Sequence, residues 1–310
     1  MLSYKFIINP IPLKKKHRAL LEKLRQNFVH NKFNFSFEFT TKDRNGTAVA
    51  KNSGKYDVVV ACGGDGTIME VINGIHAKSK LGILPLGTSN DFAKQVGINL
   101  ENCIDVLLIG KSTKIDLGSV EFKNNGKSKK MLFCSTSGIG FDARLLQLNK
   151  YKTFIKFKKV LSNLIYPICA FFLMFSYKSH ECEIKLNNKT VNINLFMLNT
   201  NFVKSMSGMK VTPNANIDNG VFDLIIFEET NIFRKLVGFI WYCVTSKKIG
   251  FREIDYISKN NLGDNKYNLR NVKSFSIKSK NTVEVQLNGD FVGCTPAKFR
   301  ILPHALDLIK

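Results

Sequence analysis

One stretch, residues 58–71, constrains the fold of this chain more than any other. It begins with an apolar run over residues 58–61, passes through the turn Gly63-Gly64-Asp65-Gly66 and continues into a helical pattern. An unbroken apolar run is typical of a buried strand in a parallel sheet, and glycines let the backbone come close to an anion at the start of the next helix. The stretch therefore predicts either a phosphate-binding turn or a tight connection in an open α/β sheet.

The acidic residue inside this turn favours the phosphate-binding alternative. Asp65 would place a negative charge beside a bound anion. Such an arrangement is useful only if a divalent cation, or a hydroxyl group to be activated, lies between the two charges.

Strand and helix patterns alternate over the first third of the chain. We expect strands at residues 4–8, 33–39, 56–61 and 81–85, and helices at residues 20–28, 47–53 and 68–75. This alternation is typical of an α/β domain with a doubly wound, mainly parallel sheet, whose ligands lie beyond the carboxyl ends of the strands. The glycine turn and a second turn, residues 86–93, both fall at that edge.

After residue 116 strand patterns follow one another directly. We expect strands at residues 119–122, 131–135, 182–186, 191–198, 221–227, 275–277 and 283–287, with helices near residues 151–177 and 233–245. Such an order predicts a second, mainly antiparallel, β-sandwich-like domain. We place the domains at residues 1–117 and 118–302, and we expect residues 303–310 to return to the first domain.

Charge and cysteine content limit the partners and the compartment. The chain has 46 Lys and Arg against 24 Asp and Glu, a net charge of +22, which favours nucleotides, nucleic acids or anionic membranes, or reflects only a solvated basic surface. The 7 scattered cysteines form neither a disulfide framework nor a zinc site. With no signal-peptide pattern and an apolar segment, residues 161–175, that is shorter than the roughly 20 residues of a membrane span, we expect a cytoplasmic protein.

Two motif blocks give the chain a resemblance to a known family. The blocks are Gly63-Gly64-Asp65-Gly66-Thr67, with Glu70, and residues 85–93, Pro-Leu-Gly-Thr-Ser-Asn-Asp-Phe-Ala. Together they resemble the bacterial diacylglycerol kinase family of lipid kinases, which is related to the sphingosine kinases and the NAD kinases. Weaker blocks follow in the order of that family at residues 114–118, 137–142, 213–223, 288–290 and 303–306.

The resemblance implies a two-domain kinase that binds ATP in a cleft beside the glycine turn. The residues implied for the nucleotide are Asn9, Thr41, Gly63, Gly64, Asp65, Gly66, Thr67, Glu70 and Thr88. Asp290 is implied as the base on the lipid hydroxyl and Asp116 as a carboxylate that supports the base or a metal. Asp65 is the rival base, because related sphingolipid kinases are thought to use the aspartate of that motif. From the residues alone, Asp290 is also an ordinary turn aspartate and Asp116 a strand-end carboxylate.

Two departures from the family pattern affect the expected ligands. Asn216, Asn219 and Val221 match positions that hold a structural Mg²⁺ in some members, but Asn219 stands where a carboxylate is common, and an amide lacks the charge that a hard cation prefers. The loop after Asn9-Pro10 carries Lys14-Lys15-Lys16 in place of a small, glycine-containing turn.

The function that we predict is an ATP-dependent, Mg²⁺-requiring lipid kinase. It would phosphorylate diacylglycerol or a similar lipid, giving phosphatidic acid or an analogue, while bound peripherally to the cytoplasmic face of an anionic membrane. The basic and aromatic residues 150–159 are the candidate docking segment, with a solvated helix face as the alternative.

A soluble NAD kinase is the second hypothesis. A catalytically inactive nucleotide- or nucleic-acid-binding protein is the third, although no nucleic-acid-binding motif supports it. The sequence leaves the exact lipid and the oligomeric state open, a homodimer included.

Overall fold

A computed structural model describes residues 2–151, 154, 165–186, 189–206, 209–210, 212, 215–229 and 272–310. Three sequence-based expectations lie outside these residues: the helix at residues 233–245, the turn at residues 187–188 and most of the docking segment at residues 150–159.

The N-terminal part is a parallel sheet with its helices in the connections. Its strands are β1 (Ser3–Ile8), β2 (Asn34–Phe39), β3 (Val58–Gly63) and β4 (Lys80–Pro85). They pair in parallel in the order β2-β1-β3-β4. The helices are α1 (Lys15–His30), α2 (Gly46–Lys51), α3 (Asp65–Ile72), α4 (Asp91–Gln95) and α5 (Cys103–Ile109). The alternation of strands and helices is as expected, and the doubly wound placement of the helices stays a prediction.

Apolar strands and aromatic rings form the core of this part. Every residue of β3 is buried, as its unbroken apolar run predicts. Phe28 of α1 packs edge-on against Tyr4 and Phe6 of β1, with ring centroids 5.0 and 5.2 Å away. These contacts fix α1 against the sheet, and the pairing of Ile8 with Cys62 holds the carboxyl ends of β1 and β3 together beside the glycine turn.

The C-terminal part is rich in antiparallel strands, as expected. Its elements are β5 (Ser112–Asn124), β6 (Lys127–Phe133), β7 (Thr136–Gly140), α6 (Phe141–Gln147), η1 (Leu148–Lys150), α8 (Ile165–Ser176), β8 (His180–Leu186), β9 (Lys189–Asn201), β10 (Ser205–Met206), β11 (Met209–Lys210), β12 (Asp223–Glu228), β13 (Ser274–Ser279), β14 (Glu284–Leu287) and β15 (Asp290–Ile309). We expected a sandwich-like arrangement. Backbone pairing instead continues from strand to strand and closes on itself, in the circuit β13-β8-β9-β7-β14-β15-β13.

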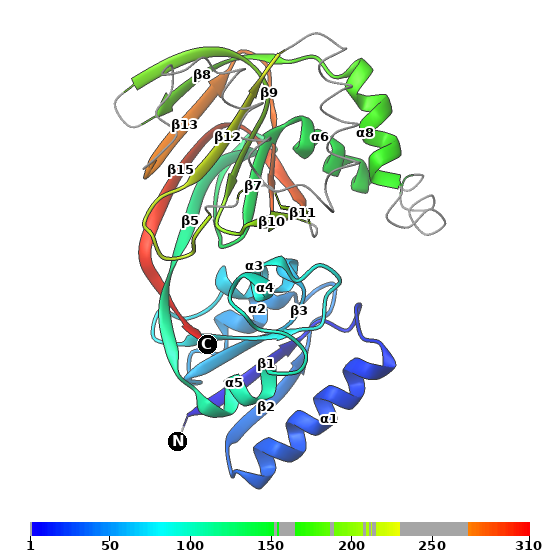
Figure 1. The fold of residues 1–310 in the computed structure, drawn as a ribbon, viewed down its shortest axis with the longest axis vertical. Helices are drawn as coiled ribbons and strands as arrows, with labels where there is room; N and C mark the ends of the chain where they lie inside the picture. Colours follow the sequence, from blue (N-terminus) through cyan, green and yellow to red (C-terminus); the bar gives the residue numbers. More distant parts are fainter. Residues whose placement is uncertain are drawn as a thin grey trace.

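Two long strands connect the two parts of the molecule. β5 pairs with β15 from Lys123 and Cys294 at one end to Ser112 and Ile309 at the other. Near its end β15 also pairs in parallel with β4, through Leu308 and Leu81. Figure 1 shows these two strands running from the strand-rich part into the part that contains β1 and β3. The domain limits given above remain a proposal.

Two hairpin turns carry the expected Asn-Gly sequence. Asn125 and Gly126 have φ of 49° and 75°, and Asn288 and Gly289 have φ of 49° and 87°. Two consecutive positive φ values are typical of the two-residue turns that match the twist of antiparallel strands, and Asn-Gly adopts them most readily. The Asn288-Gly289 turn places Asp290 at the first position of β15.

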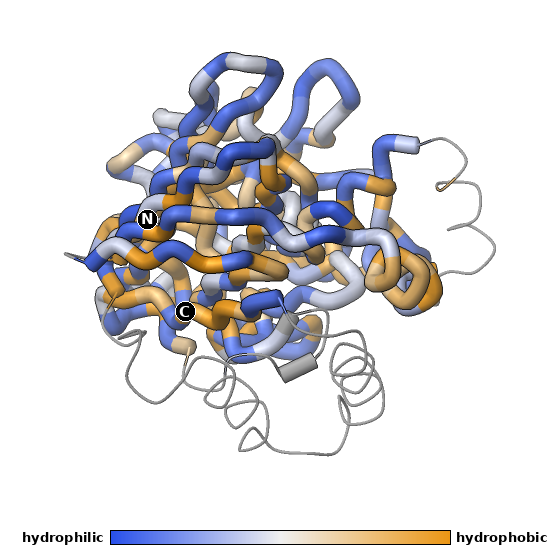
Figure 2. Tube along the Cα trace, turned by 90° about the horizontal axis from the view of Figure 1, so that it is seen from above, coloured by the Kyte–Doolittle hydropathy of each residue, from blue (hydrophilic) through white to orange (hydrophobic). Residues whose placement is uncertain are grey.

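α8 presents large apolar side chains to the surface. Figure 2 shows this helix as an orange coil at the right, and its exposed residues are Ile168, Phe171, Phe172 and Phe175. Within the part of the chain that the structure describes, no helix is both long and apolar enough to cross a bilayer.

Candidate active site

The glycine turn lies at the carboxyl end of β3 and packs against the second turn. A Cβ atom built on Gly63 would lie 2.2 Å from Thr67 Oγ1, and one on Gly87 would lie 2.5 Å from Gly64 Cα. The backbone N–H groups of Leu86 and Gly87 donate to Gly63 O over 2.9 and 3.2 Å. Glycine is therefore required at this contact, because a side chain would push the two turns apart.

The start of α3 offers a suitable environment for phosphate. Gly64 is the N-cap residue, and no side chain caps the helix there. The first N–H groups of a helix have no acceptor within it, and together with the helix dipole they favour an anion. Asn9 lies at the same place, since its Nδ2 donates to Thr67 Oγ1 over 3.2 Å. The structure thus brings Asn9, Gly63, Gly64 and Thr67 together.

Asp290 faces the glycine turn from the C-terminal part. A Cβ atom built on Gly66 would lie 3.8 Å from Asp290 Oδ2, although 224 residues separate the two positions. Asp290 is exposed. The carboxylate implied as the base and the turn implied for phosphate therefore meet in one site.

The carboxylate of Asp65 holds α4. Its Oδ2 accepts the N–H of Asp91 over 3.1 Å and its Oδ1 accepts the N–H of Phe92 over 2.9 Å. Burial raises the pKa of Asp65 and these two N–H groups partly oppose that shift. Both oxygens are engaged with backbone, which favours a role in fixing the second turn over the role of proton acceptor.

Replacing Asp65 with Ala is expected to lower the free energy of unfolding by about 3 kcal/mol, because two buried N–H groups lose a charged acceptor. Urea denaturation followed by circular dichroism measures this loss. The matched control is Asp105→Ala at an exposed position of α5, which should change stability little. Equal stability of the Asp65 variant and the wild type would contradict the assignment.

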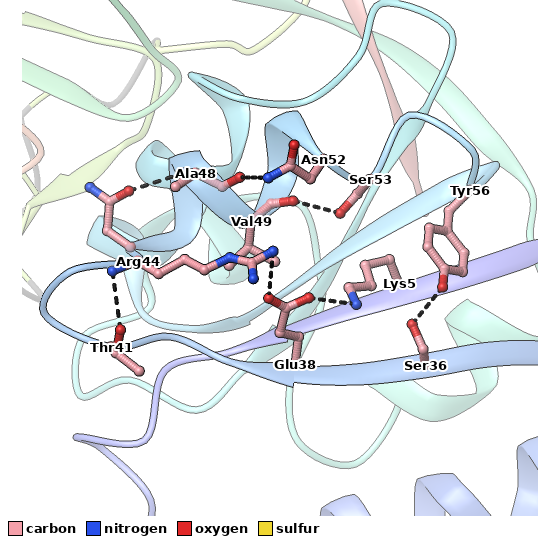
Figure 3. Close-up of polar contacts among 11 residues, drawn as sticks. Lys5, Ser36, Glu38, Thr41, Arg44, Ala48, Val49, Asn52, Ser53 and Tyr56 are labelled. Carbon is pink, nitrogen blue, oxygen red and sulfur yellow. Dashed lines mark hydrogen bonds and ion pairs between the residues drawn. The ribbon is translucent and has the colours of Figure 1, made fainter.

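Of three further residues implied for the nucleotide, two have hydrogen-bond partners in the protein and one is exposed to solvent. Glu70 Oε2 accepts the N–H of Gly46 at the start of α2 over 2.8 Å. Thr41 Oγ1 accepts the N–H of Arg44 over 3.1 Å, within a loop that an Arg44–Glu38 ion pair holds (Figure 3). Thr88 is exposed on the second turn. Their contacts with nucleotide stay predictions.

Asp116 binds the backbone of the loop at residues 216–221, which was expected to hold a structural metal. It is 1% exposed, and its oxygens accept the N–H groups of Gly220 over 2.6 Å and His304 over 2.9 Å. Asn216 Oδ1 accepts the N–H of Ile217, and Asn219 Oδ1 accepts that of Val221.

This donor set fits a hard cation poorly, because such a cation prefers carboxylate ligands, whereas Asn216 and Asn219 offer only neutral amide oxygens that already accept N–H groups. In addition, the described residues contain no cluster of three or more His, Cys, Asp and Glu side chains suited to a metal ion. We therefore derive no step through a metal bound by Asn216, Asn219 and Val221.

Asp142 and Gln286 were not among the predicted site residues. Gln286 Nε2 donates to Asp142 Oδ2 over 3.1 Å, and Gln286 Oε1 accepts the N–H of Gly289 over 3.0 Å, one residue before Asp290. Two sequence signals point to them: a polar residue inside the apolar strand at residues 283–287, and Gly138 and Gly140 just before Asp142.

The Asp142 carboxyl group gives a pH dependence of stability. Burial raises its pKa from 3.8 to about 6. Since the folded protein binds this proton more tightly than the unfolded chain, the stabilisation is complete below the unfolded pKa and is lost as the pH rises through the folded pKa. The Asp142→Asn variant cannot ionise at this position. Between pH 4 and pH 7 the free energy of unfolding of the wild type should therefore fall relative to that of the variant. Urea denaturation across this range tests it, and parallel curves would contradict it.

Comparison with known proteins supports the resemblance found in the sequence. Residues 3–120 match the family model described as diacylglycerol kinase catalytic domain. This part of the chain is therefore similar to the diacylglycerol kinase catalytic domain. The resemblance found in the sequence is confirmed, and the protein is a kinase.

Relatives extend the likeness beyond this domain. A diacylglycerol kinase from Bacillus subtilis (strain 168) is 26% identical over 304 residues, which are 95% of this chain and 92% of the relative. A diacylglycerol kinase from Staphylococcus aureus (strain Newman) is 29% identical over 259 residues, 82% of this chain and 74% of the relative.

Solved structures share the fold. A crystal structure of a diacylglycerol kinase from Bacillus anthracis has a TM-score of 0.71 at 18% identity, over 99% of this chain and 96% of that one. An NAD kinase from Archaeoglobus fulgidus, in complex with ATP, has a TM-score of 0.52 at 9% identity, over 99% and 94% of the two chains. The two-part layout of the diacylglycerol kinase fold is therefore confirmed.

Proposed function

We propose that this chain is an ATP-dependent lipid kinase that phosphorylates the hydroxyl group of diacylglycerol or a similar lipid. The observation that carries the proposal is the position of Asp290 Oδ2, 3.8 Å from the place where a Cβ of Gly66 would lie. A phosphate at the glycine turn and a hydroxyl beside Asp290 would then be neighbours. The match to the catalytic domain and the names of the relatives support the same chemistry.

Each part of the site has a role in phosphoryl transfer, a reaction that requires mainly positioning and charge neutralisation. Bound ATP would supply the γ-phosphoryl group, and Mg²⁺ would neutralise negative charge on its phosphates. The N–H groups at the start of α3 stabilise the negative charge of the phosphates. Asp290 accepts the proton of the lipid hydroxyl while the new O–P bond forms and the bond to the β-phosphate oxygen breaks. We assign the base to Asp290, because both oxygens of Asp65 accept N–H groups of α4.

We propose that α8 contacts the membrane that supplies the lipid. Ile168, Phe171, Phe172 and Phe175 are spaced three or four residues apart and are 43, 38, 68 and 56% exposed. Residues with this spacing share one face of a helix. An exposed apolar face on a chain of net charge +22 is suited to the interface of an anionic, cytoplasmic membrane surface.

Replacing Phe172 and Phe175 together with Glu is expected to weaken binding to anionic vesicles at least tenfold, because burying each ring contributes roughly 1.5–3 kcal/mol. Vesicle co-sedimentation at fixed salt measures the change. Ile109→Glu, on the exposed face of α5, is the control and should bind as the wild type does. Equal binding by the double variant would exclude α8 as the contact.

The proposed function is tested with purified full-length chain, Mg²⁺, γ-labelled ATP and vesicles that contain diacylglycerol. We expect labelled phosphatidic acid. A parallel reaction with NAD and no vesicles tests the NAD kinase alternative. Phosphorylation of NAD with no labelled lipid from any neutral lipid alcohol would overturn the proposal. Salt-sensitive nucleic-acid binding without ATP turnover would favour the inactive binding protein.

A further inference from the structure

A buried glutamine links α6 to the turn that carries Asp290. Gln286 of β14 is 0% exposed. Its Nε2 donates to Asp142 Oδ2 over 3.1 Å, and its Oε1 accepts the N–H of Gly289 over 3.0 Å. One amide thus connects the first turn of α6 to the Asn288–Gly289 peptide unit, through the N–H of the residue that precedes Asp290.

The carboxylate of Asp142 determines which way this amide points. A glutamine amide donates at one end and accepts at the other, whereas an ionised carboxylate only accepts. Asp142 therefore holds Nε2 toward α6 and leaves Oε1 for Gly289. The opposite orientation would set an NH₂ group against the N–H of Gly289, and two donors would face each other.

The Oδ2 atom of Asp142 is itself held by a neighbouring strand. In the orientation that satisfies its hydrogen bonds, the Asn199 amide donates to Asp142 Oδ2 over 2.8 Å. A Cβ atom on Gly138 would lie 1.8 Å from the same oxygen, so glycine is needed for the carboxylate to lie on β7. Gly138, Asn199 and Gln286 are register partners on adjacent strands, which places their side chains on one face of the sheet.

The other contacts of the turn hold Asn288 and pair Asp290 with Leu287 across the hairpin. Asn288 donates its N–H to Thr136 O over 2.8 Å, and its Oδ1 accepts the N–H of Thr136 over 3.1 Å. These bonds fix the first residue of the turn to β7. The second residue, Gly289, has φ of 87° and is held through Gln286.

We infer that Asp142 is a positioning residue for the proposed reaction, which acts through the Gln286 amide to fix the Gly289 peptide and thereby aim the Asp290 carboxylate at the glycine turn. The inference rests on the proposed function. It adds a residue 148 positions away in sequence that acts through another side chain.

The test compares three variants in the full chain. Asp142→Leu and Gln286→Leu remove the acceptor and the amide, while Asp142→Asn keeps an oxygen that can accept from Gln286. Asp105→Asn and Gln26→Leu, both at exposed positions, are the matched controls. Hydrogen exchange of the peptide spanning residues 286–291 reports on the Gly289 N–H. Steady-state kinetics with diacylglycerol vesicles separate kcat from the KM for ATP.

Both leucine variants are expected to speed exchange in that peptide at least about tenfold. They should lower kcat about 100-fold through misplacement of Asp290, with the KM for ATP within about twofold of wild type. Asp142→Asn should restore most of both properties, and the controls should match the wild type.

Unchanged exchange in Gln286→Leu, or a kcat that falls only in proportion to the folded fraction, would overturn the inference. If Asp142→Leu does not fold, Gln286→Leu and Asp142→Asn still decide it. Failure of the wild type to phosphorylate any lipid would instead overturn the proposed function. The exchange measurement would still show whether Gln286 protects the N–H of Gly289.

Discussion

Replacing Asp290 with Asn should lower kcat for lipid phosphorylation by about 10³-fold, the size expected when a general base is lost. The substitution changes the charge of the side chain and hardly its size. Asp290 faces Gly66 across the site from the first residue of β15, and it is exposed. The KM for ATP should therefore stay near the wild-type value, because the glycine turn is unchanged. Initial rates with labelled ATP and diacylglycerol vesicles measure both constants.

Asp105→Asn is the control for the loss of one negative charge, since Asp105 is exposed on α5. A kcat above about one tenth of the wild-type value in Asp290→Asn would contradict a base role, because base catalysis contributes at least about 10²-fold. The base would then have to be sought elsewhere, with Asp65 the first candidate.

Replacing Gly66 with Ala should lower kcat/KM about 100-fold without loss of stability, since small displacements of reacting groups have effects of this size. The new methyl group would meet only Asp290 Oδ2, at 3.8 Å. That is ordinary contact, so the fold accepts the change. The methyl group would nevertheless occupy the space between the helix N-terminus and the base. Alanine in α3 is also up to roughly 1 kcal/mol more favourable than glycine, so Tm should be equal or higher.

Gly87→Ala is the informative comparison for this variant. Its Cβ would lie 2.5 Å from Gly64 Cα, a backbone contact that cannot give way without moving one of the two turns. This variant should lose activity and Tm together. Calorimetry and the vesicle assay on both variants separate the effects. Full activity in Gly66→Ala would show that the space beside Gly66 is not used in the reaction.

Local sequence signals were sufficient where one segment determines the structure. The apolar run of β3, the glycine turn and the Asn288-Gly289 turn each depend on residues that are neighbours in sequence, so their positions could be predicted. The closeness of Asp290 to Gly66 came from the family resemblance, because spacing alone cannot place residues so far apart in sequence.

Partners that depend on tertiary packing could not be predicted. Glu70 meets Gly46 and Asp65 meets Asp91 only because α2, α3 and α4 come together around the glycine turn. Asn216 and Asn219 were expected to bind a metal from the family resemblance, but their oxygens accept N–H groups of their own loop. The closure of the antiparallel circuit through β13 and β15 likewise depends on pairing between distant segments.

The long ladder between β5 and β15 limits how the enzyme can admit a bulky acyl chain. Both strands pass from one half of the molecule into the other, with register shifts in their pairing between Cys294 and Lys298 and between Leu302 and Leu306, so two paired strands join the halves in place of a single linker. Any change in the gap between Gly66 and Asp290 must bend or twist two hydrogen-bonded strands at once. Lipid entry should therefore proceed by local movement of surface segments, with the spacing of the reacting groups preserved through each catalytic cycle.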